Sequence, residues 1–371
     1  MNVIIAAAGT GGHINPGIAI ANKIIEEHKN AKITFIGTIR GLENDLVPRA
    51  GFNLERIEAY GINRKISIQN LKNMLKTLHS YKEARNIVKK LKPDIVIGTG
   101  GYICGPVMSA AKKYGIPTIL HESNAYPGVA VKVLSKKVDT VLVGFKDAKK
   151  RLPKAKKVVV SGTPTKLKKI DLLSSQKEEL KKELRIKNDL PIVLVFGGSQ
   201  GAKSINEALL GIIRNKLNEK YHIIWAAGQN QYNVVKEELE KDKFSINNIK
   251  NITIVPYIYN MQDVMNMADL IVARSGAMTI TEVAIVGKPA IFIPFPYATE
   301  NHQEYNARVL ADIGAARIIL DKDLNMENLN KQILEIVEDK TLQKQMGELA
   351  LKSAVKNVED KIYNEIKLLI K

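Results

Sequence analysis

The chain has 371 residues, of which 45% are hydrophobic, so it is long enough to build two domains of ordinary size. Its 56 basic and 38 acidic residues give a formal net charge of +18 at pH 7, which predicts attraction to polyanions such as nucleic acid, an anionic membrane face or phosphorylated substrates. The single cysteine, Cys104, excludes an intramolecular disulfide and is expected to serve packing in a reducing compartment.

The first predicted element is a β-strand over residues 3–8, a short apolar run that glycines interrupt. No basic segment precedes it, so we expect no signal peptide. No apolar run approaches the roughly 20 residues that a membrane-spanning helix needs. Any membrane contact is therefore expected to be peripheral.

Short runs of β-branched residues then alternate with helical stretches through both halves of the chain. This alternation predicts parallel sheets with crossover helices, and hence an α/β fold with two doubly wound units. The predicted strands are residues 33–36, 95–97, 118–120, 140–143 and 158–160 in the first half, and 192–196, 223–226, 252–255, 270–272, 290–293 and 317–320 in the second.

A polar, lysine-rich segment over residues 165–188 separates the two halves and puts the domain boundary near Pro164. We therefore predict a first domain of residues 1–163 and a second of residues 164–345. Residues 346–371 remain as a helical C-terminal segment.

Each half opens with a strand that enters a glycine-rich turn, at residues 9–13 and 197–202. Such a turn lets backbone amides approach an anion, and the following helix adds the partial positive charge of its N-terminus. Neither turn has the full dinucleotide fingerprint or the Lys-Ser/Thr of a P-loop, which argues against NAD and ATP. Two such turns heading two similar domains favour a diphosphate ligand, and tight turn packing is the alternative.

Polar side chains follow other predicted strands. His13 could accept a hydroxyl proton, or could cap its helix. His121 comes directly after the strand ending at residue 120, where α/β sheets bind ligands, and a simple turn is equally consistent with it. A glycine-rich loop over residues 100–106 has a similar position. Glu282, in the helix after the Ser-Gly-Ala turn at 275–277, could accept both hydroxyls of a ribose or be a solvated surface residue.

Two further patterns concern metals and membranes. Asp321-Lys322-Asp323 has the spelling of a metal-binding Asp-x-Asp motif, but the lysine and the late position favour a surface turn. The stretch 64–90 has helical periodicity and could lie on anionic lipid, although a helix packed on the sheet is as consistent. Its apolar positions are Ile68, Leu71, Leu75 and Leu78, and its basic ones are Arg64, Lys65, Lys72, Lys76, Lys82, Arg85, Lys89 and Lys90.

Six motifs in one order resemble the MurG-type N-acetylglucosaminyltransferases that make the lipid-linked disaccharide-pentapeptide of peptidoglycan. They are Gly-Thr-Gly-Gly-His at 9–13, Gly-Gly-Tyr at 100–102, His-Glu-Ser-Asn at 121–124, Gly-Gly-Ser-Gln-Gly-Ala at 197–202, Ser-Gly-Ala-Met-Thr at 275–279, and Asn-His-Gln at 301–303 followed by Asn-Ala at 306–307. Because several independent loops match over nearly the whole chain, the set is far more specific than any one of them.

The resemblance implies a GT-B architecture, in which two Rossmann-like domains face each other across a cleft and the final helix packs back on the first domain. It implies inverting transfer of N-acetylglucosamine from UDP-N-acetylglucosamine to the muramyl 4-hydroxyl of an undecaprenyl-diphosphate-linked muramyl pentapeptide. The enzyme is then expected at the cytoplasmic face of the cell membrane, held by anionic lipid, with no nucleic-acid partner. No tightly bound metal or other cofactor is expected, and a divalent cation could stimulate turnover through the diphosphate.

The resemblance also implies a role for each matching residue. His13 is the expected catalytic base, or else a donor to the diphosphate. The residues expected to bind UDP-N-acetylglucosamine are Thr10, Gly11, Gly12, Asn124, Lys166, Ser199, Ile258, Ala277, Met278, Thr279, Glu282 and Gln303. Those expected near the acceptor are Tyr102, His121 and Glu122.

This sequence departs from the family pattern at two positions. Lys166 stands where an arginine is common and keeps the charge without the bidentate fork, and Ala8 replaces a frequent glycine. Three other functions compete: transfer to diacylglycerol or another lipid, a UDP-sugar 2-epimerase, and a basic nucleic-acid binder. The last lacks support, because aromatic content is 5% and no stacking or zinc motif is present.

Overall fold

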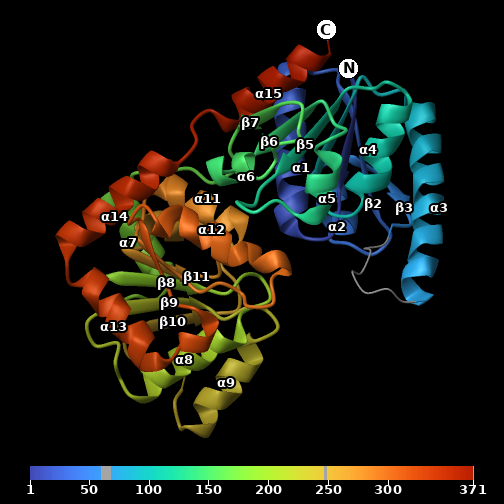
Figure 1. Cartoon of the computed structure of the whole chain (residues 1–371). Coiled ribbons are helices and arrows are strands. Elements are labelled where there is room, and N and C mark those ends of the chain that lie inside the picture. The colour runs from blue at the N-terminus through green and yellow to red at the C-terminus, as the bar shows by residue number, and fades with distance from the viewer. Residues whose placement is uncertain (60–67, 246–248, 371) are drawn as a thin grey trace. The chain divides into compact units, whose positions relative to one another are not determined.

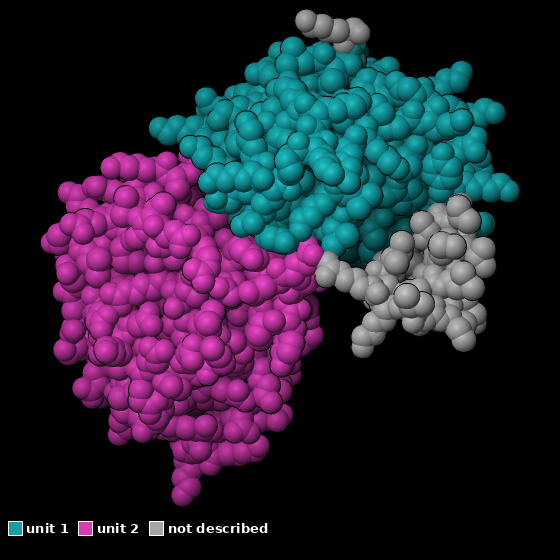
Figure 2. All heavy atoms as spheres, viewed as in Figure 1, with its two compact units in different colours: residues 1–166, 355–371 teal, residues 167–354 magenta. Residues whose placement is uncertain are grey.

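The computed structural model describes residues 1–59, 68–245 and 249–370, with the side chains of residues 68–78 outside the description. The chain forms two compact units, coloured separately in Figure 2: Met1–Lys166 with Val355–Lys371, and Leu167–Ala354. The first boundary thus follows Lys166 instead of residue 163. The chain re-enters the first unit at Val355 instead of residue 346, because the helix before it packs within the second unit.

The first unit is a parallel sheet between two layers of helices (Figure 1). Its seven strands have the order β3-β2-β1-β4-β5-β6-β7. The strands are β1 (Asn2–Ala7), β2 (Lys32–Thr38), β3 (Asn53–Ile57), β4 (Ile95–Gly100), β5 (Thr118–Glu122), β6 (Thr140–Val143) and β7 (Val158–Val160). The helices are α1 (Gly11–Glu27), α2 (Glu43–Arg49), α3 (Ile68–Leu91), α4 (Cys104–Lys113), α5 (Val129–Leu134), α6 (Lys146–Lys150) and α15 (Val358–Leu369).

The two faces of this sheet have separate cores. Strand residues such as Ile5 and Phe35 pack with α1, α2 and α15, whereas Ile4 and Ile36 pack with α3, α4, α5 and α6 on the other side. Successive side chains of a strand point to opposite faces, so a strand covered on both sides must be apolar throughout. This is why the central strands appear in the sequence as continuous apolar runs.

The second unit repeats the architecture with a six-stranded parallel sheet in the order β10-β9-β8-β11-β12-β13. Its strands are β8 (Ile192–Phe196), β9 (His222–Ala226), β10 (Ile252–Val255), β11 (Leu270–Ala273), β12 (Ala290–Phe292) and β13 (Ala316–Ile318). Its helices are α7 (Ser174–Glu183), α8 (Lys203–Arg214), α9 (Tyr232–Lys241), α10 (Met261–Met267), α11 (Ala277–Val286), α12 (His302–Ala311), α13 (Met326–Val337) and α14 (Lys340–Ser353), with short 3₁₀ turns η2 (Thr299–Asn301) and η3 (Asp321–Asp323).

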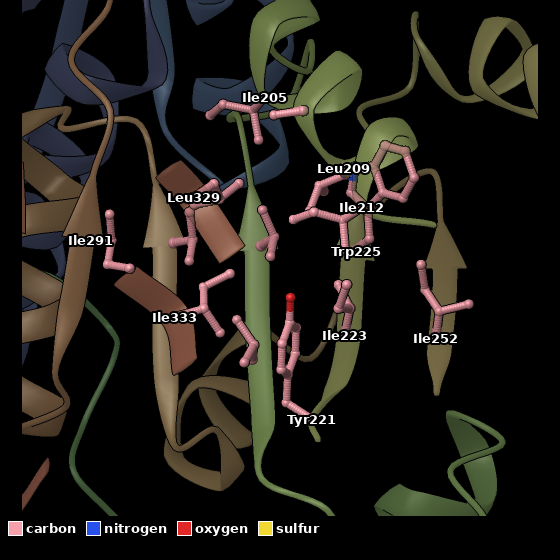
Figure 3. Close-up of a cluster of buried hydrophobic side chains, with 14 of the residues drawn as sticks. Ile205, Leu209, Ile212, Tyr221, Ile223, Trp225, Ile252, Ile291, Leu329 and Ile333 are labelled. Carbon is pink, nitrogen blue, oxygen red and sulfur yellow. The ribbon is translucent and has the colours of Figure 1, made fainter. Parts of the chain in front are cut away.

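One face of the second sheet is the core shown in Figure 3, where side chains of β9 meet those of α8 and α13. Its two large polar rings are buried with their polar atoms paired. Tyr221 donates to Asn330 at 2.7 Å, and Trp225 donates to Asn206 at 3.0 Å. Burying these rings is favourable because neither polar atom is left without a partner. Two doubly wound parallel units confirm the predicted α/β fold.

The helix predicted over residues 64–90 is present as α3 from Ile68 onward. Its C-terminal half packs on the sheet through Ala84 and Val88, both buried. The apolar positions of the predicted lipid-facing surface lie outside the described residues; they are Ile68, Leu71, Leu75 and Leu78. No helix in the described part of the chain is long and apolar enough to cross a membrane.

Candidate active site

In the first unit, the candidate site begins at the turn between β1 and α1. Gly9 has a φ of +96°, a conformation that glycine adopts without strain, and α1 starts two residues later. The N-cap residue Thr10 is exposed and makes no side-chain cap hydrogen bond. No acidic residue occupies the first turn of α1, so the amides of Gly11 and Gly12 lie at an uncapped helix N-terminus. This is the arrangement that binds anions.

His13 lies in the first turn of α1, and its ring is oriented by its neighbours. Its Nδ1 is 3.1 Å from the carbonyl oxygen of Ala8, and its own carbonyl accepts from Thr99 Oγ1 at 2.8 Å. A carbonyl oxygen can only accept, so Nδ1 carries the proton and Nε2 of the neutral ring is an acceptor. A general base needs such an acceptor atom, and Nε2 of His13 is the one that the predicted mechanism uses.

The end of β4 leaves room for the His13 ring. Gly100 and Gly101 have φ values of +129° and +83°, and a Cβ at Gly100 would overlap the imidazole. Tyr102 follows with 42% of its surface exposed. Because β1 and β4 are adjacent in the sheet, the two glycine loops lie side by side. Burial raises the pKa of Cys104, the first residue of α4, to about 12, so this thiol stays protonated and serves packing.

The predicted acceptor residues after β5 are placed differently from what the sequence suggested. His121 is fully buried and donates from Nε2 to the carbonyl oxygen of Gly162 at 3.0 Å. Burial lowers its pKa to about 4, so the ring is neutral at physiological pH. His121 therefore ties the end of β5 to the segment after β7, and its ring offers no surface to a ligand.

Glu122 supports the loop that follows. Its Oε1 accepts from the backbone and side-chain nitrogens of Asn124 at 2.8 and 2.9 Å, and its Oε2 accepts from the amide of Gly128 at 2.9 Å. Only 6% of Glu122 is exposed, whereas Asn124 is half-buried. Of the residues predicted in this motif, Asn124 is thus the most exposed, and Glu122 holds it in position through two hydrogen bonds. Lys166, the last residue of this unit's first segment, is exposed.

In the second unit, the turn between β8 and α8 repeats the pattern of the first. Ser199 is exposed, and Gly201 has a φ of +82° with its Cα against the carbonyl of Ala227, where a Cβ would overlap that oxygen. Helix α8 begins after Ala202, which provides no side-chain cap. A second uncapped helix N-terminus therefore lies at the carboxyl edge of a parallel sheet.

Helix α11 provides a third uncapped helix N-terminus, after β11. Its N-cap is Gly276, no side chain caps it, and its first turn consists of Ala277, Met278 and Thr279 with no acidic residue. The hydroxyl of Ser275 is buried here and has no hydrogen-bond partner among the described residues. Glu282 is four residues after Met278, so both lie on the same face of α11. The predicted donor residues of this motif are thus brought together.

Two other predicted donor residues lie elsewhere in the second unit. Ile258, after β10, is 5% exposed, so it offers little surface to a ligand. Gln303, at the start of α12, is half-buried, and its Oε1 accepts from the amide of Phe295 at 3.0 Å. Its side-chain NH₂ group remains the part that could contact a sugar.

Arg274, which the sequence did not single out, follows β11 and links it to the segments after β12 and β13 and to the start of α8. Its Nη1 donates to the carbonyls of Ile293 and Pro294 at 3.0 and 3.1 Å and to Asp321 at 2.6 Å, and its Nη2 donates to Ser204 at 2.9 Å. Asp321, the first residue of the Asp-x-Asp sequence, therefore forms an ion pair with Arg274. In the described ranges, no group of three or more His, Cys, Asp or Glu residues could hold a metal ion.

Comparisons with known proteins show the family of the chain. The glycosyltransferase family 28 N-terminal domain matches residues 3–143, and its C-terminal domain matches residues 192–362. The chain is 42% identical over 370 residues to the UDP-N-acetylglucosamine–N-acetylmuramyl-(pentapeptide) pyrophosphoryl-undecaprenol N-acetylglucosamine transferase of Ruminiclostridium cellulolyticum, with 100% of both chains covered. It is 44% identical over 367 residues to the protein of that name from a Thermoanaerobacter species, with 99% of each covered.

A crystal structure of Acinetobacter baumannii MurG matches with a TM-score of 0.77 and 32% identity, covering 99% of both chains. The two Rossmann-like units are accordingly those of a GT-B glycosyltransferase. The chain therefore belongs to glycosyltransferase family 28 and, within it, to the MurG-type N-acetylglucosaminyltransferases.

Proposed function

We propose that this enzyme transfers N-acetylglucosamine from UDP-N-acetylglucosamine to the 4-hydroxyl of the muramyl unit in undecaprenyl-diphosphate-linked muramyl pentapeptide. The observation that carries the proposal is full-length identity of 42–44% to enzymes named for this reaction. The uncapped helix N-termini of α1, α8 and α11 support it, because a UDP-sugar carries the anionic diphosphate that such termini bind.

In the proposed mechanism, the muramyl O4 attacks the anomeric carbon as the bond from that carbon to the β-phosphate oxygen breaks. The configuration inverts in this single displacement, and UDP departs. Nε2 of His13 takes the proton of the attacking hydroxyl, a role that its Nδ1–H bond to Ala8 supports. Helix-terminal amides stabilise the charge on the departing UDP, and Glu282 binds the uridine ribose. Tyr102 and Asn124 are the proposed acceptor-side contacts.

The reaction is tested with radiolabelled UDP-N-acetylglucosamine and two acceptors in parallel, a short-chain lipid-diphosphate muramyl pentapeptide and diacylglycerol. Label on the muramyl lipid alone is the expected result. Label on diacylglycerol alone would keep the fold and donor site but overturn the cell-wall role. Release of UDP without any acceptor would instead favour a hydrolytic or epimerase-type reaction.

The residue roles are tested with matched substitutions. His13→Ala is expected to lower kcat by about 10²- to 10⁴-fold, while His79→Ala, at an exposed histidine of α3, leaves it near the native value. Glu282→Gln is expected to raise KM for the donor by about tenfold or more, with Glu207→Gln, exposed on α8, as its control. Native turnover in His13→Ala would remove His13 from both proposed roles.

We propose further that no tightly bound metal is needed and that a divalent ion stimulates turnover through the diphosphate. Dialysis against EDTA is expected to leave measurable transfer that added Mg²⁺ increases. Complete loss, restored only by one transition metal, would contradict this and point to a metal site.

A peripheral position on the cytoplasmic face of the cell membrane is part of the proposal. In the described residues it is supported by α5, where Val129 and Val133 are 45% and 55% exposed and the exposed Lys136 and Lys137 follow. Apolar side chains beside lysines suit the boundary of an anionic bilayer. Co-sedimentation with vesicles containing anionic lipid is expected at low salt and lost at high salt; equal binding to neutral vesicles would argue against the electrostatic part.

A further inference from the structure

A buried carboxylate lies beside the glycine loop that carries His13. Glu43, the first residue of α2, has no exposed surface. Its Oε1 accepts from the amide and hydroxyl of Thr38 at 2.8 and 2.6 Å, and its Oε2 accepts from the amide of Gly9 at 3.0 Å. Burial acts to raise the pKa of Glu43, but these hydrogen bonds outweigh it and hold the pKa below its ordinary value. The group is therefore a carboxylate at neutral pH.

The surrounding backbone is shaped to admit this side chain. A Cβ at Gly37 would stand 2.5 Å from Cγ of Glu43, and a Cβ at Gly41 would overlap the carboxylate. Two glycines, one in β2 and one before α2, thus leave the volume that the side chain fills. The space for Glu43 is available only because neither position has a side chain.

One peptide group connects Glu43 to His13. The N–H of Gly9 donates to Glu43, and the carbonyl oxygen of the same peptide, that of Ala8, accepts from Nδ1 of His13 at 3.1 Å. In a trans peptide these two groups point in opposite directions, so the carboxylate and the imidazole lie at its two ends. The next carbonyl, that of Gly9, faces the amide of Leu42 at 3.5 Å. The start of α2 therefore contacts both sides of Gly9.

A carboxylate that accepts a hydrogen bond from a peptide N–H polarises that peptide group. The carbonyl oxygen of the same peptide then becomes a stronger acceptor. A stronger acceptor at Ala8 favours the imidazole tautomer with the proton on Nδ1. That tautomer leaves the lone pair on Nε2, where a base must have it.

We propose that Glu43 is a positioning residue for His13, acting through the Ala8–Gly9 peptide to fix the tautomer and orientation of the ring. In a Ser-His-Asp triad a carboxylate contacts and orients the histidine directly. Here a peptide group lies between the carboxylate and the histidine. The inference rests on the proposed role of His13 as the base.

The test is Glu43→Gln, which keeps the size of the side chain but replaces one acceptor oxygen with an NH₂ group. We expect kcat to fall by about 10- to 100-fold while KM for UDP-N-acetylglucosamine changes by less than about twofold. In protein labelled with ¹⁵N-histidine, we expect the His13 signals to change from the Nδ1–H pattern to a tautomer mixture. The spectrum of His13→Ala identifies those signals among the six histidines.

Asp139→Asn is the matched control. Asp139 also accepts from a threonine amide and hydroxyl, those of Thr118, at 3.0 and 2.9 Å, but at the amino end of β5. Its substitution is expected to lower stability without changing the His13 signals. If Gln at position 43 prevents folding, Glu43→Asp serves instead, because its shorter arm cannot reach both Thr38 and Gly9.

An unchanged His13 tautomer together with native kcat in the position 43 variant would overturn the inference. That result would leave the proposed function intact, provided that His13→Ala is inactive. Conversely, native transfer by His13→Ala would overturn the base role, whatever the ¹⁵N spectra of the position 43 variant show.

Discussion

The second unit contains a buried histidine whose protonation should limit its stability in acid. His222, the first residue of β9, is 2% exposed. Its Nε2 lies 3.0 Å from the hydroxyl of Thr253, and that hydroxyl donates to the carbonyl of Leu184 at 2.6 Å. Nε2 must therefore be the donor in the first bond. Nδ1 is left to accept from the side-chain amide of Asn188 at 3.3 Å. A proton on Nδ1 would face another donor.

Burial lowers the pKa of His222 from 6.5 to about 4. Between these two pH values the unfolded chain binds more protons than the folded unit. The free energy of unfolding is therefore highest above pH 6.5 and decreases as the pH falls toward 4. With the values given, the contribution of His222 makes the free energy of unfolding about 2 kcal/mol smaller at pH 5 than at pH 7.

Replacing His222 with Gln removes this titration, because the amide is neutral at every pH and can still donate to Thr253. The chain has one tryptophan, Trp225, which is buried in the same strand and reports on the second unit alone. Urea unfolding followed by its fluorescence should show a loss between pH 7 and pH 5 that is smaller in His222→Gln by about 2 kcal/mol. An equal loss in both proteins would refute the argument that burial keeps this ring neutral.

Three further predictions concern other parts of the chain. Gly100→Ala should lower kcat by about tenfold or more in the transfer assay, because its Cβ would occupy the place of the His13 ring. Arg274→Lys should weaken binding of UDP-N-acetylglucosamine by about tenfold in calorimetry, since an ammonium cannot hold four partners in a planar fork. Ile362→Ala should destabilise the first unit by about 3 kcal/mol, seen as faster amide hydrogen exchange in α1, because the side chain is 2% exposed against that helix.

Most of the fold could be predicted because parallel strands that are covered on both faces are apolar along their whole length. The strand that the sequence did not predict is β3, an edge strand whose sequence Asn-Leu-Glu-Arg-Ile mixes charged and apolar residues and is buried only at Ile57. An edge strand with partial cover has no continuous apolar run to detect.

The candidate site could be predicted where glycine-rich turns follow strands, since these turns are local in sequence. His121 was predicted to follow β5, but β5 continues to Glu122, two residues beyond the predicted end, and the His121 side chain is buried. Glu43 gave no local signal, because its partner Gly9 is 34 residues earlier in the chain. Hydrogen bonds of that sequence separation leave no periodicity for a single sequence to reveal.

The division of the chain has a consequence for its biosynthesis. The second unit is one continuous segment, Leu167–Ala354, whereas the first unit needs α15, whose Ile362 and Ile366 complete the core beside α1. During synthesis the ribosome therefore releases every residue of the second unit before the last helix of the first. The N-terminal unit, although made first, is expected to reach its final stability last. A truncated protein that ends at Ala354 should resist protease in its second unit and remain cleavable in its first.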